Sequence, residues 1–307
     1  MTSDTERWKG LDAASYDEIA DQYDTISHRL AYPVAARLVE LAALAPGERV
    51  LDVGTGTGMV PFEVARTAAG TSVVGTDISS GMIEKASRKA VEHGLDPDRV
   101  SFQVMDAEAM SFAPGEFDVV TSAFALGHMP RPERAMAEMF RVMRPGGRLL
   151  VTVGSRPPLA SLPALRHAAV EVGRRLRAMR GLRLGADLLD RLVDATLPPD
   201  TDAPQGAELA TQLSRADSIM ALARGAGFDG VEWTWQNFQN EIASADEFWE
   251  VQRTICTRAR KRLLSAAPDA IEEVRRRFIE TSLRTLRRGG QLVFPVSAVF
   301  VTARKHR

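Results

Sequence analysis

The feature that most constrains this 307-residue chain is a glycine-rich junction, V-L-D-V-G-T-G-T-G, at residues 50–58. Residues 49–53 have the apolar pattern of a buried strand, and apolar residues at helical spacing begin at Val60. The glycines at 54, 56 and 58 allow positive φ and let a ligand lie against bare backbone. Free N–H groups and the helix dipole at such a strand-to-helix junction favour an electron-rich or anionic ligand group.

Alternating strands and helices follow this junction. The apolar patterns predict strands at 49–53, 72–76, 100–104, 118–122 and 148–153, with helices at 59–69, 80–93 and 132–142 between them. This alternation is typical of βαβ units and predicts an α/β fold around a parallel sheet. Ligands of such sheets lie beyond the carboxyl ends of the strands. A last strand at 292–303 contains Pro295, which favours an edge position or a bulge.

Two helical interruptions divide the α/β pattern. We expect an N-terminal helical segment (1–45), a core (46–154), a helical insertion (155–214), more core (215–241), a second helical insertion (242–290) and a last strand (291–307). Residues 1–15 are polar and are expected to fray. If the strand near 230–239 runs parallel to the one at 148–153, both insertions leave the ligand side of the sheet and cap it.

Composition narrows the possible functions. The net charge of −1 provides no overall field that would recruit nucleic acid or a membrane surface. The single cysteine, Cys256, excludes a disulfide framework and a cysteine-rich metal site, so no metal is expected. The N-terminus lacks the apolar core of a signal peptide, and no apolar run approaches the ~20 residues of a membrane span. We therefore expect a cytoplasmic protein.

The glycine spacing and two later carboxylates favour a nucleoside ligand other than a dinucleotide. Met59 stands where the third glycine of a dinucleotide fingerprint would fall, and no P-loop motif follows. Asp77 ends the second strand, where a carboxylate can accept hydrogen bonds from both ribose hydroxyls. Asp106, just past the third strand, could accept from an exocyclic amine or close a turn.

Five blocks within 46–153 resemble class I S-adenosylmethionine-dependent methyltransferases, in the family's order and at plausible spacing. The blocks are residues 50–58, 75–82, 105–108, 117–120 and 141–147. The likeness extends to the branch of quinone-biosynthesis C-methyltransferases and other small-molecule methyltransferases, whose N-terminal A-x-x-Y-D segment is similar to residues 20–24. The resemblance implies a Rossmann-like, seven-stranded sheet with an antiparallel last strand. It also implies S-adenosyl-L-methionine as the cofactor.

The resemblance assigns one group of residues to the methionine end of that cofactor. Gly54, Gly56 and Gly58 would line the methionine moiety, with Asp52 near its ammonium group. Ser122 would lie beside the sulfonium. Tyr23 would close over the carboxylate, or else pack between helices.

A second group is implied at the nucleoside end. Asp77 would hold the ribose hydroxyls, and Met82 follows in the same block. Ile78 and Ala107 would contact the adenine ring. Asp106 would accept from the adenine amine, with a turn cap as the alternative.

Two residues are candidates for a general base. His128 follows the fourth strand and would stand in the wall of the substrate pocket, where histidine suits proton transfer near neutrality. It could instead only shape the pocket. Glu171, in the first insertion, could be a base or a surface carboxylate. Methyl transfer to an acidic acceptor needs little base, because alignment with the electrophilic sulfonium supplies much of the acceleration.

The two insertions are expected to select the acceptor. Their many arginines could clamp an anionic group, or form a solvated face paired with Asp and Glu. Phe248 and Trp249 could line an apolar pocket or pack in a core. The predicted function is carbon or oxygen methylation of a small organic acceptor, anionic or apolar, in biosynthesis, with a homodimer as one possible assembly. The alternative is a protein that uses bound S-adenosylmethionine for a non-methylating cyclisation or rearrangement, or a non-catalytic binding subunit.

Overall fold

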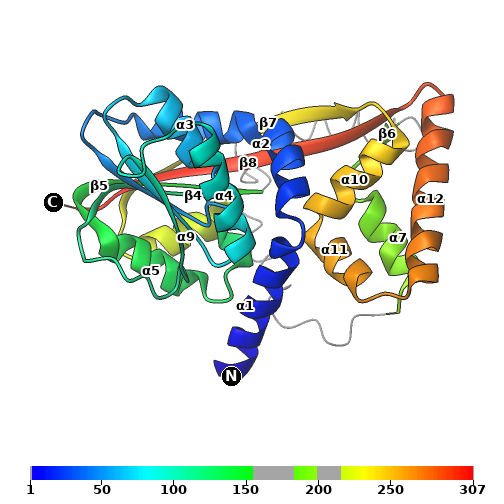
Figure 1. The fold of residues 1–307 in the computed structure, drawn as a ribbon, viewed down its shortest axis with the longest axis horizontal. Helices are drawn as coiled ribbons and strands as arrows, with labels where there is room; N and C mark the ends of the chain where they lie inside the picture. Colours follow the sequence, from blue (N-terminus) through cyan, green and yellow to red (C-terminus); the bar gives the residue numbers. More distant parts are fainter. Residues whose placement is uncertain (1, 155–182, 199–215, 307) are drawn as a thin grey trace.

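One twisted sheet organises the fold (Figure 1). The computed structural model describes residues 2–154, 183–198 and 216–306. The strands in these ranges are β1 (Arg49–Val53), β2 (Ser72–Asp77), β3 (Val100–Val104), β4 (Phe117–Ala123), β5 (Met143–Gly154), β6 (Arg183–Leu184), β7 (Asp229–Ile242) and β8 (Gln291–Arg304). Their order is β3-β2-β1-β4-β5-β8-β6, and β7 also pairs with β8. Strands β1 to β5 pair in parallel, whereas β8 is antiparallel to β5 and β7, which confirms the expected fold class.

Helices cover both faces of this sheet. They are α2 (Ala20–Ala42), α3 (Met59–Thr67), α4 (Ser80–Glu92), α5 (Pro132–Val142) and α9 (Ala216–Gly225), with a short 3-10 helix, η1, at Leu126–His128. One core cluster joins α5 and α9 to the sheet, and another joins α2 and α3 to its opposite face. Because β1 and β4 are covered on both sides, their burial is continuous rather than alternating.

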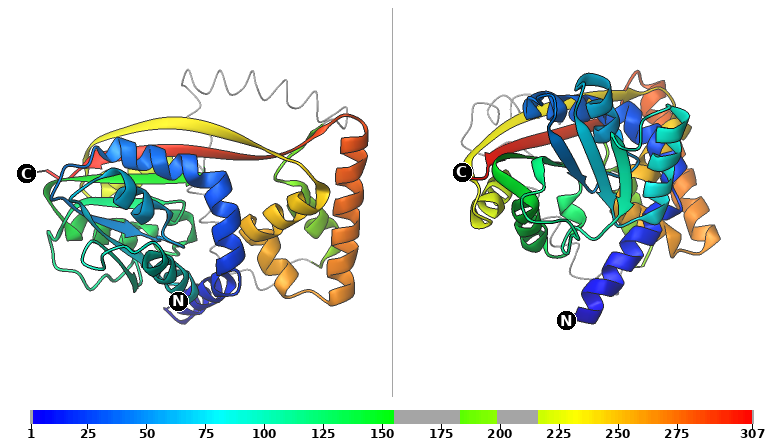
Figure 2. Two further views of the ribbon diagram at one scale, coloured as in Figure 1. Left: turned by 45° about the horizontal axis from the view of Figure 1, so that its top comes forward. Right: turned by 60° about the vertical axis from the view of Figure 1, so that its left-hand side comes forward.

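A separate group of helices stands at the far end of the long β7–β8 ribbon (Figures 1 and 2). These are α7 (Leu188–Thr196), α10 (Ala245–Ile255), α11 (Thr257–Leu264) and α12 (Pro268–Arg287), and they share an apolar cluster with the ends of the ribbon. We call them the cap helices. Strands β5 and β7 both oppose β8, so they run in the same direction. The chain therefore enters α10 from the ligand end of the sheet, as expected for the second insertion, whereas most of the first insertion lies outside the described residues.

Pro295 lies in the part of β8 that pairs with β7. Within the described residues, pairing of β8 with β5 extends to the Gly154–Ala298 pair, whereas β7 continues alongside β8 as far as Leu292. Pro295 lies opposite Gln239 of β7. An edge position or a bulge at Pro295 stays a prediction, because the residues that follow Gly154 are outside the described ranges.

Two elements differ from the sequence-based expectation. Residues 1–15 were expected to fray, but Thr2–Asp17 forms a helix, α1, in which Lys9, Asp12 and Ser15 are buried. The prediction was wrong because these polar side chains find partners in distant segments. The short strand β6 was also not predicted, since two residues beside β8 carry no alternating pattern.

Candidate functional site

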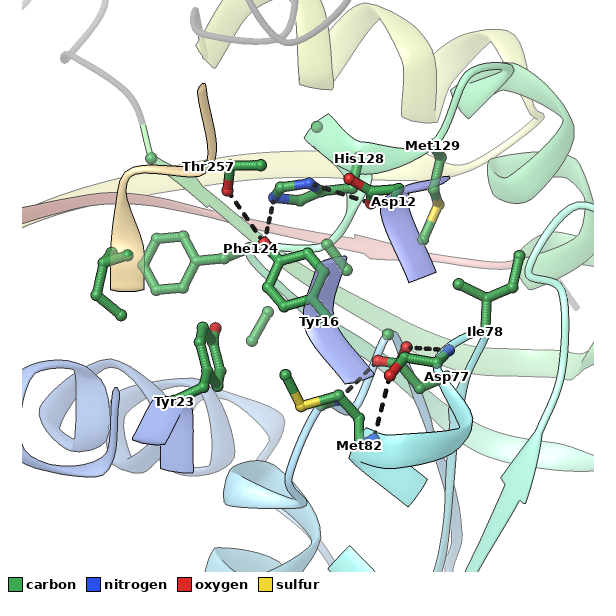
Figure 3. Close-up of a pocket in the computed structure, with 18 of the residues that line it drawn as sticks. Asp12, Tyr16, Tyr23, Asp77, Ile78, Met82, Phe124, His128, Met129 and Thr257 are labelled. Atoms are coloured by element: carbon green, nitrogen blue, oxygen red, sulfur yellow. Dashed lines mark hydrogen bonds and ion pairs between the residues drawn. The ribbon is translucent and has the colours of Figure 1, made fainter. Parts of the chain in front are cut away.

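A cavity of about 1200 Å³ lies beyond the carboxyl ends of β1, β2 and β4 (Figure 3). Its walls also come from α1, α2, the loop containing η1, the start of α11 and the middle of β8. Pockets that hold one small ligand are usually roughly 300–1,000 Å³. The cavity therefore has room for a cofactor and an acceptor together.

The glycine turn forms one wall of this cavity. Gly54 has φ 71°, and a Cβ on it would lie 2.2 Å from the Cβ of Ala125, so the turn packs closely on the loop after β4. Gly56 has φ 54°, and a Cβ there would meet no atom within 4 Å. Gly58 does not line the cavity; its φ is 86° and a Cβ would lie 2.8 Å from Phe62. Packing alone therefore accounts for glycine at 58, whereas Gly56 exposes its backbone to the cavity.

Asp77 stands beside this turn with its carboxylate held by backbone groups. One carboxylate oxygen accepts from the Gly56 N–H at 2.8 Å, and the other accepts from the Ser79 N–H at 3.0 Å. Burial raises the pKa of Asp77, although these two hydrogen bonds oppose the increase. Ile78 and Met82 line the cavity next to it. The carboxylate is thus fixed in orientation and retains lone pairs for a ligand.

Asp106 meets an ion-pair partner that the sequence did not reveal. Its Oδ2 lies 2.6 Å from the Lys9 ammonium of α1, which is also 2.8 Å from Glu108. The other oxygen, Oδ1, accepts from the Glu108 N–H at 2.9 Å, so Asp106 also closes a turn. Burial alone would lower the pKa of Lys9, but the two carboxylates more than offset it and the pKa is raised. Ala107 lines the cavity between them.

The other three residues predicted at the methionine end are Asp52, Tyr23 and Ser122. Asp52 is buried at the end of β1, accepts from Thr121 Oγ1 at 2.6 Å, and lines a second cavity of about 60 Å³ together with Tyr23. Burial raises the pKa of Asp52 to about 6. Tyr23 lines both cavities and meets Tyr16 edge-on, with 5.7 Å between ring centroids. Ser122 is fully buried within β4 and lines neither cavity.

His128 lies where three distant segments converge (Figure 3). Its Nδ1 is 3.6 Å from Oδ2 of Asp12 in α1, and its Nε2 is 3.5 Å from the Tyr16 hydroxyl. That hydroxyl is in turn 3.2 Å from the hydroxyl of Thr257, at the start of α11. All four side chains line the cavity. Glu171, the other predicted base, lies outside the described residues.

Phe124 is a further cavity residue that the sequence did not reveal. It directly follows β4, with φ 58°, a left-handed conformation rarely adopted by bulky residues. Such strain collects at ligand sites, where the surrounding structure holds it. It carries no local sequence signal, because any residue may end a strand.

The cap helices contribute charge to the cavity. Arg258, Lys261 and Arg262 of α11 line it, and both arginines pair with Asp194 of α7. The sequence left open whether such arginines bind an anionic group or pair with Asp and Glu. Arg258 and Arg262 pair with an aspartate and also line the cavity. Phe248 and Trp249 do not line it; they pack against Phe278 at 5.3 and 5.4 Å between ring centroids.

In the described ranges, no group of three or more His, Cys, Asp or Glu side chains is arranged to hold a metal ion. None of the described helices is both long and apolar enough to cross a membrane.

Comparisons with known proteins agree with this architecture. A family model described as a methyltransferase domain matches residues 50–147. The chain is 33% identical to nocamycin O-methyltransferase of Saccharothrix syringae, over 75% of this chain and 77% of that protein. It is 38% identical to demethylmenaquinone methyltransferase of Thermus thermophilus, over 47% of this chain. Among solved structures, the cyclase SpnF aligns with a TM-score of 0.53 at 20% identity, over 90% of this chain and 81% of SpnF.

The match to the quinone-biosynthesis relatives is partial. The aligned region covers 66% of the Thermus thermophilus protein and 59% of the demethylmenaquinone methyltransferase of Renibacterium salmoninarum. The chain thus spans less than two thirds of the length of these relatives.

Proposed function

Because the chain belongs to the class I S-adenosylmethionine-dependent methyltransferases, we propose that it methylates carbon or oxygen of a small organic acceptor. The observation that carries the proposal is the continuity of one cavity. Its walls run from Gly56 and Asp77, at the strand ends, to His128 and the start of α11. Cofactor and acceptor could therefore meet inside a single enclosure.

The cofactor end of the cavity fits S-adenosylmethionine in shape and in chemistry. Asp77 has lone pairs left for ribose hydroxyls, and the open space above Gly56 leaves room beside the backbone. Ile78, Met82 and Ala107 supply apolar walls for an adenine ring. Asp52, buried without losing its acceptor oxygens, suits an ammonium group. Once bound, the cofactor supplies an electrophilic methyl group on a sulfonium.

The chain's own contribution is enclosure, alignment and proton transfer. Residues of α1, α2 and α11 line the cavity, and such walls would reduce the access of water to the reacting atoms. His128 would accept the proton that the acceptor loses on methylation. The names of the matched relatives, which refer to nocamycin and demethylmenaquinone, support a biosynthetic small molecule as the acceptor. The segment boundaries, a cytoplasmic location and a homodimer remain predictions.

Calorimetry with S-adenosylhomocysteine tests the cofactor site. A charge-assisted hydrogen bond contributes about 1.5–3 kcal/mol, so Asp77→Asn should weaken binding at least about tenfold. Asp98→Asn, on an exposed turn, is the matched control and should bind as the wild type does. Equal affinity of the Asp77 and Asp98 variants would refute the ribose assignment.

Methyl-labelled cofactor and a panel of phenols, enols and carboxylic acids test the reaction. Transfer of label to an acceptor is expected. Conversion of an acceptor without label transfer would instead support the cyclisation or rearrangement alternative. The likeness to SpnF concerns the fold alone and does not favour that alternative.

A further inference from the structure

The buried carboxylate of Asp12 faces the predicted base from a helix that local sequence gave no reason to connect with it. Asp12 is 4% exposed and lies on α1. One carboxylate oxygen contacts the Lys261 ammonium of α11, and the other lies 3.6 Å from His128 Nδ1 (Figure 3). Asp12 thus sits between the histidine and the cap.

We propose that Asp12 is a positioning residue that holds His128 with Nδ1 protonated, leaving the Nε2 lone pair to take the acceptor's proton. The inference rests on the proposed methyl transfer. The acceptor's X–H bond (X being carbon or oxygen) breaks, its proton moves to Nε2, and its electron pair forms the new bond to the methyl carbon. The electrons of the broken carbon–sulfur bond remain on sulfur.

The tautomer follows from the chemistry of the two neighbours. A carboxylate only accepts hydrogen bonds, so the charge of Asp12, 3.6 Å away, favours a hydrogen on the ring nitrogen that faces it. Neutral imidazole then has its lone pair on Nε2, which faces the Tyr16 hydroxyl at 3.5 Å. Tyr16 can turn its hydrogen toward Nε2 or toward Thr257 at 3.2 Å. An acceptor that enters beside Tyr16 would find a base with a defined direction.

Asp12 is suited to this task because it stays anionic although it is buried. Burial by itself would raise the pKa of Asp12, but hydrogen bonding and charge from the Lys261 ammonium and from His128 in its protonated form more than offset it, and the pKa is lowered. When His128 gains the proton, the positive imidazolium forms next to this negative charge. The same arrangement stabilises the imidazolium in serine hydrolases.

A purely structural role for Asp12 makes a different prediction. If Asp12 only ties α1 to α11 through Lys261, then Lys261→Met should have the same consequences as Asp12→Asn. If Asp12 acts on the imidazole, Lys261→Met should be much milder, because the carboxylate and His128 both remain. Glu6→Gln is the matched control on α1, since Glu6 does not itself line the cavity and contacts neither Asp12 nor His128; its partners are Lys9 and Arg131.

Nitrogen-15 NMR of the imidazole ring in the complex with S-adenosylhomocysteine reads the tautomer directly, with His128→Gln to assign the signals. We expect Nδ1–H in the wild type, in Glu6→Gln and in Lys261→Met, and a shift to Nε2–H in Asp12→Asn. Wild-type protein with Nε2–H, or Asp12→Asn with unchanged Nδ1–H, would overturn the proposal. If the protein does not bind S-adenosylhomocysteine, the proposed function fails, whereas the tautomer can still be read in the free protein.

Kinetics with an acceptor from the labelled panel provide the second readout. A general base typically contributes about 10²–10⁴-fold, so Asp12→Asn should lower kcat by about 100-fold with little change in KM. Asp12→Glu should recover part of that loss, because it restores the carboxylate. An equal loss of kcat in Lys261→Met would identify Asp12 as a tether and overturn the positioning role.

Discussion

Replacing Asp52 with Asn should stabilise the free protein at neutral pH and weaken cofactor binding. Asp52 is 1% exposed at the end of β1, and burial raises its pKa from 3.8 to about 6 despite the hydrogen bond from Thr121. An acid whose pKa is raised by folding is destabilising when ionised. The protein accepts this cost, we propose, because the charge later meets the cofactor's ammonium group.

The sign and size of the effect follow from proton linkage. Between pH 3.8 and about 6, the folded state binds more protons at Asp52 than the unfolded state does, so stability falls as pH rises through this window. Each pH unit between the two pKa values corresponds to about 1.4 kcal/mol, so the full cost above pH 6 is about 3 kcal/mol. Asn removes the charge and keeps an oxygen that can accept from Thr121. The gain in stability should approach that value at pH 8 and vanish below pH 4.

Urea unfolding of the wild type and Asp52→Asn at pH 8 and pH 4 measures this difference. The variant should be more stable than the wild type only at pH 8, and calorimetry at pH 8 should show weaker binding of S-adenosylhomocysteine. Asp98→Asn, on the exposed turn before β3, should show no comparable pH dependence. A variant that is destabilised equally at both pH values would refute the reasoning.

Three further substitutions test the glycine turn and the cap helices separately. Gly54→Ala combines a left-handed φ with a Cβ 2.2 Å from Ala125 and should cost about 2–4 kcal/mol in unfolding free energy, whereas Gly56→Ala carries only the backbone strain of about 1–2 kcal/mol. Thermal melts compare the two, and equal losses would contradict the close packing at Gly54. Phe248→Ala leaves a void among the cap helices and should cost about 3–5 kcal/mol while S-adenosylhomocysteine still binds. Loss of that binding in a folded variant would contradict the expectation that packing of the cap helices and cofactor binding are independent.

Local sequence signals were sufficient for strands β1 to β5, and they indicated the strand ends that line one end of the cavity. The pattern of apolar residues predicted the strands and the helices between them, because strands that are buried on both faces are rich in apolar residues. Gly56 of the glycine turn and Asp77 are 21 residues apart in sequence. A parallel sheet brings them together, because the carboxyl ends of its strands lie at the same edge. The sequence therefore predicted where a nucleoside-type cofactor could bind.

The interior positions within that end were harder to predict. Ser122 was expected beside the sulfonium, yet it is fully buried within β4. Gly58 was expected beside the methionine moiety, yet it does not line the cavity, and a Cβ on it would lie 2.8 Å from Phe62 and 3.0 Å from Phe102. A motif indicates which segment approaches a ligand, but the pleat and the turn decide which side chain faces it.

The sequence by itself determined the α/β sheet, the glycine turn and the family, because these depend on periodicity and on short motifs. Only the tertiary structure decided the acceptor side. There Tyr16 meets His128 across 112 residues and Asp12 meets Lys261 across 249, and at the nucleoside end Lys9 meets Asp106 across 97. A polar residue of an N-terminal helix carries no local sign of its partner, because the pairing is chosen when distant segments pack together and bury charges that must then be compensated.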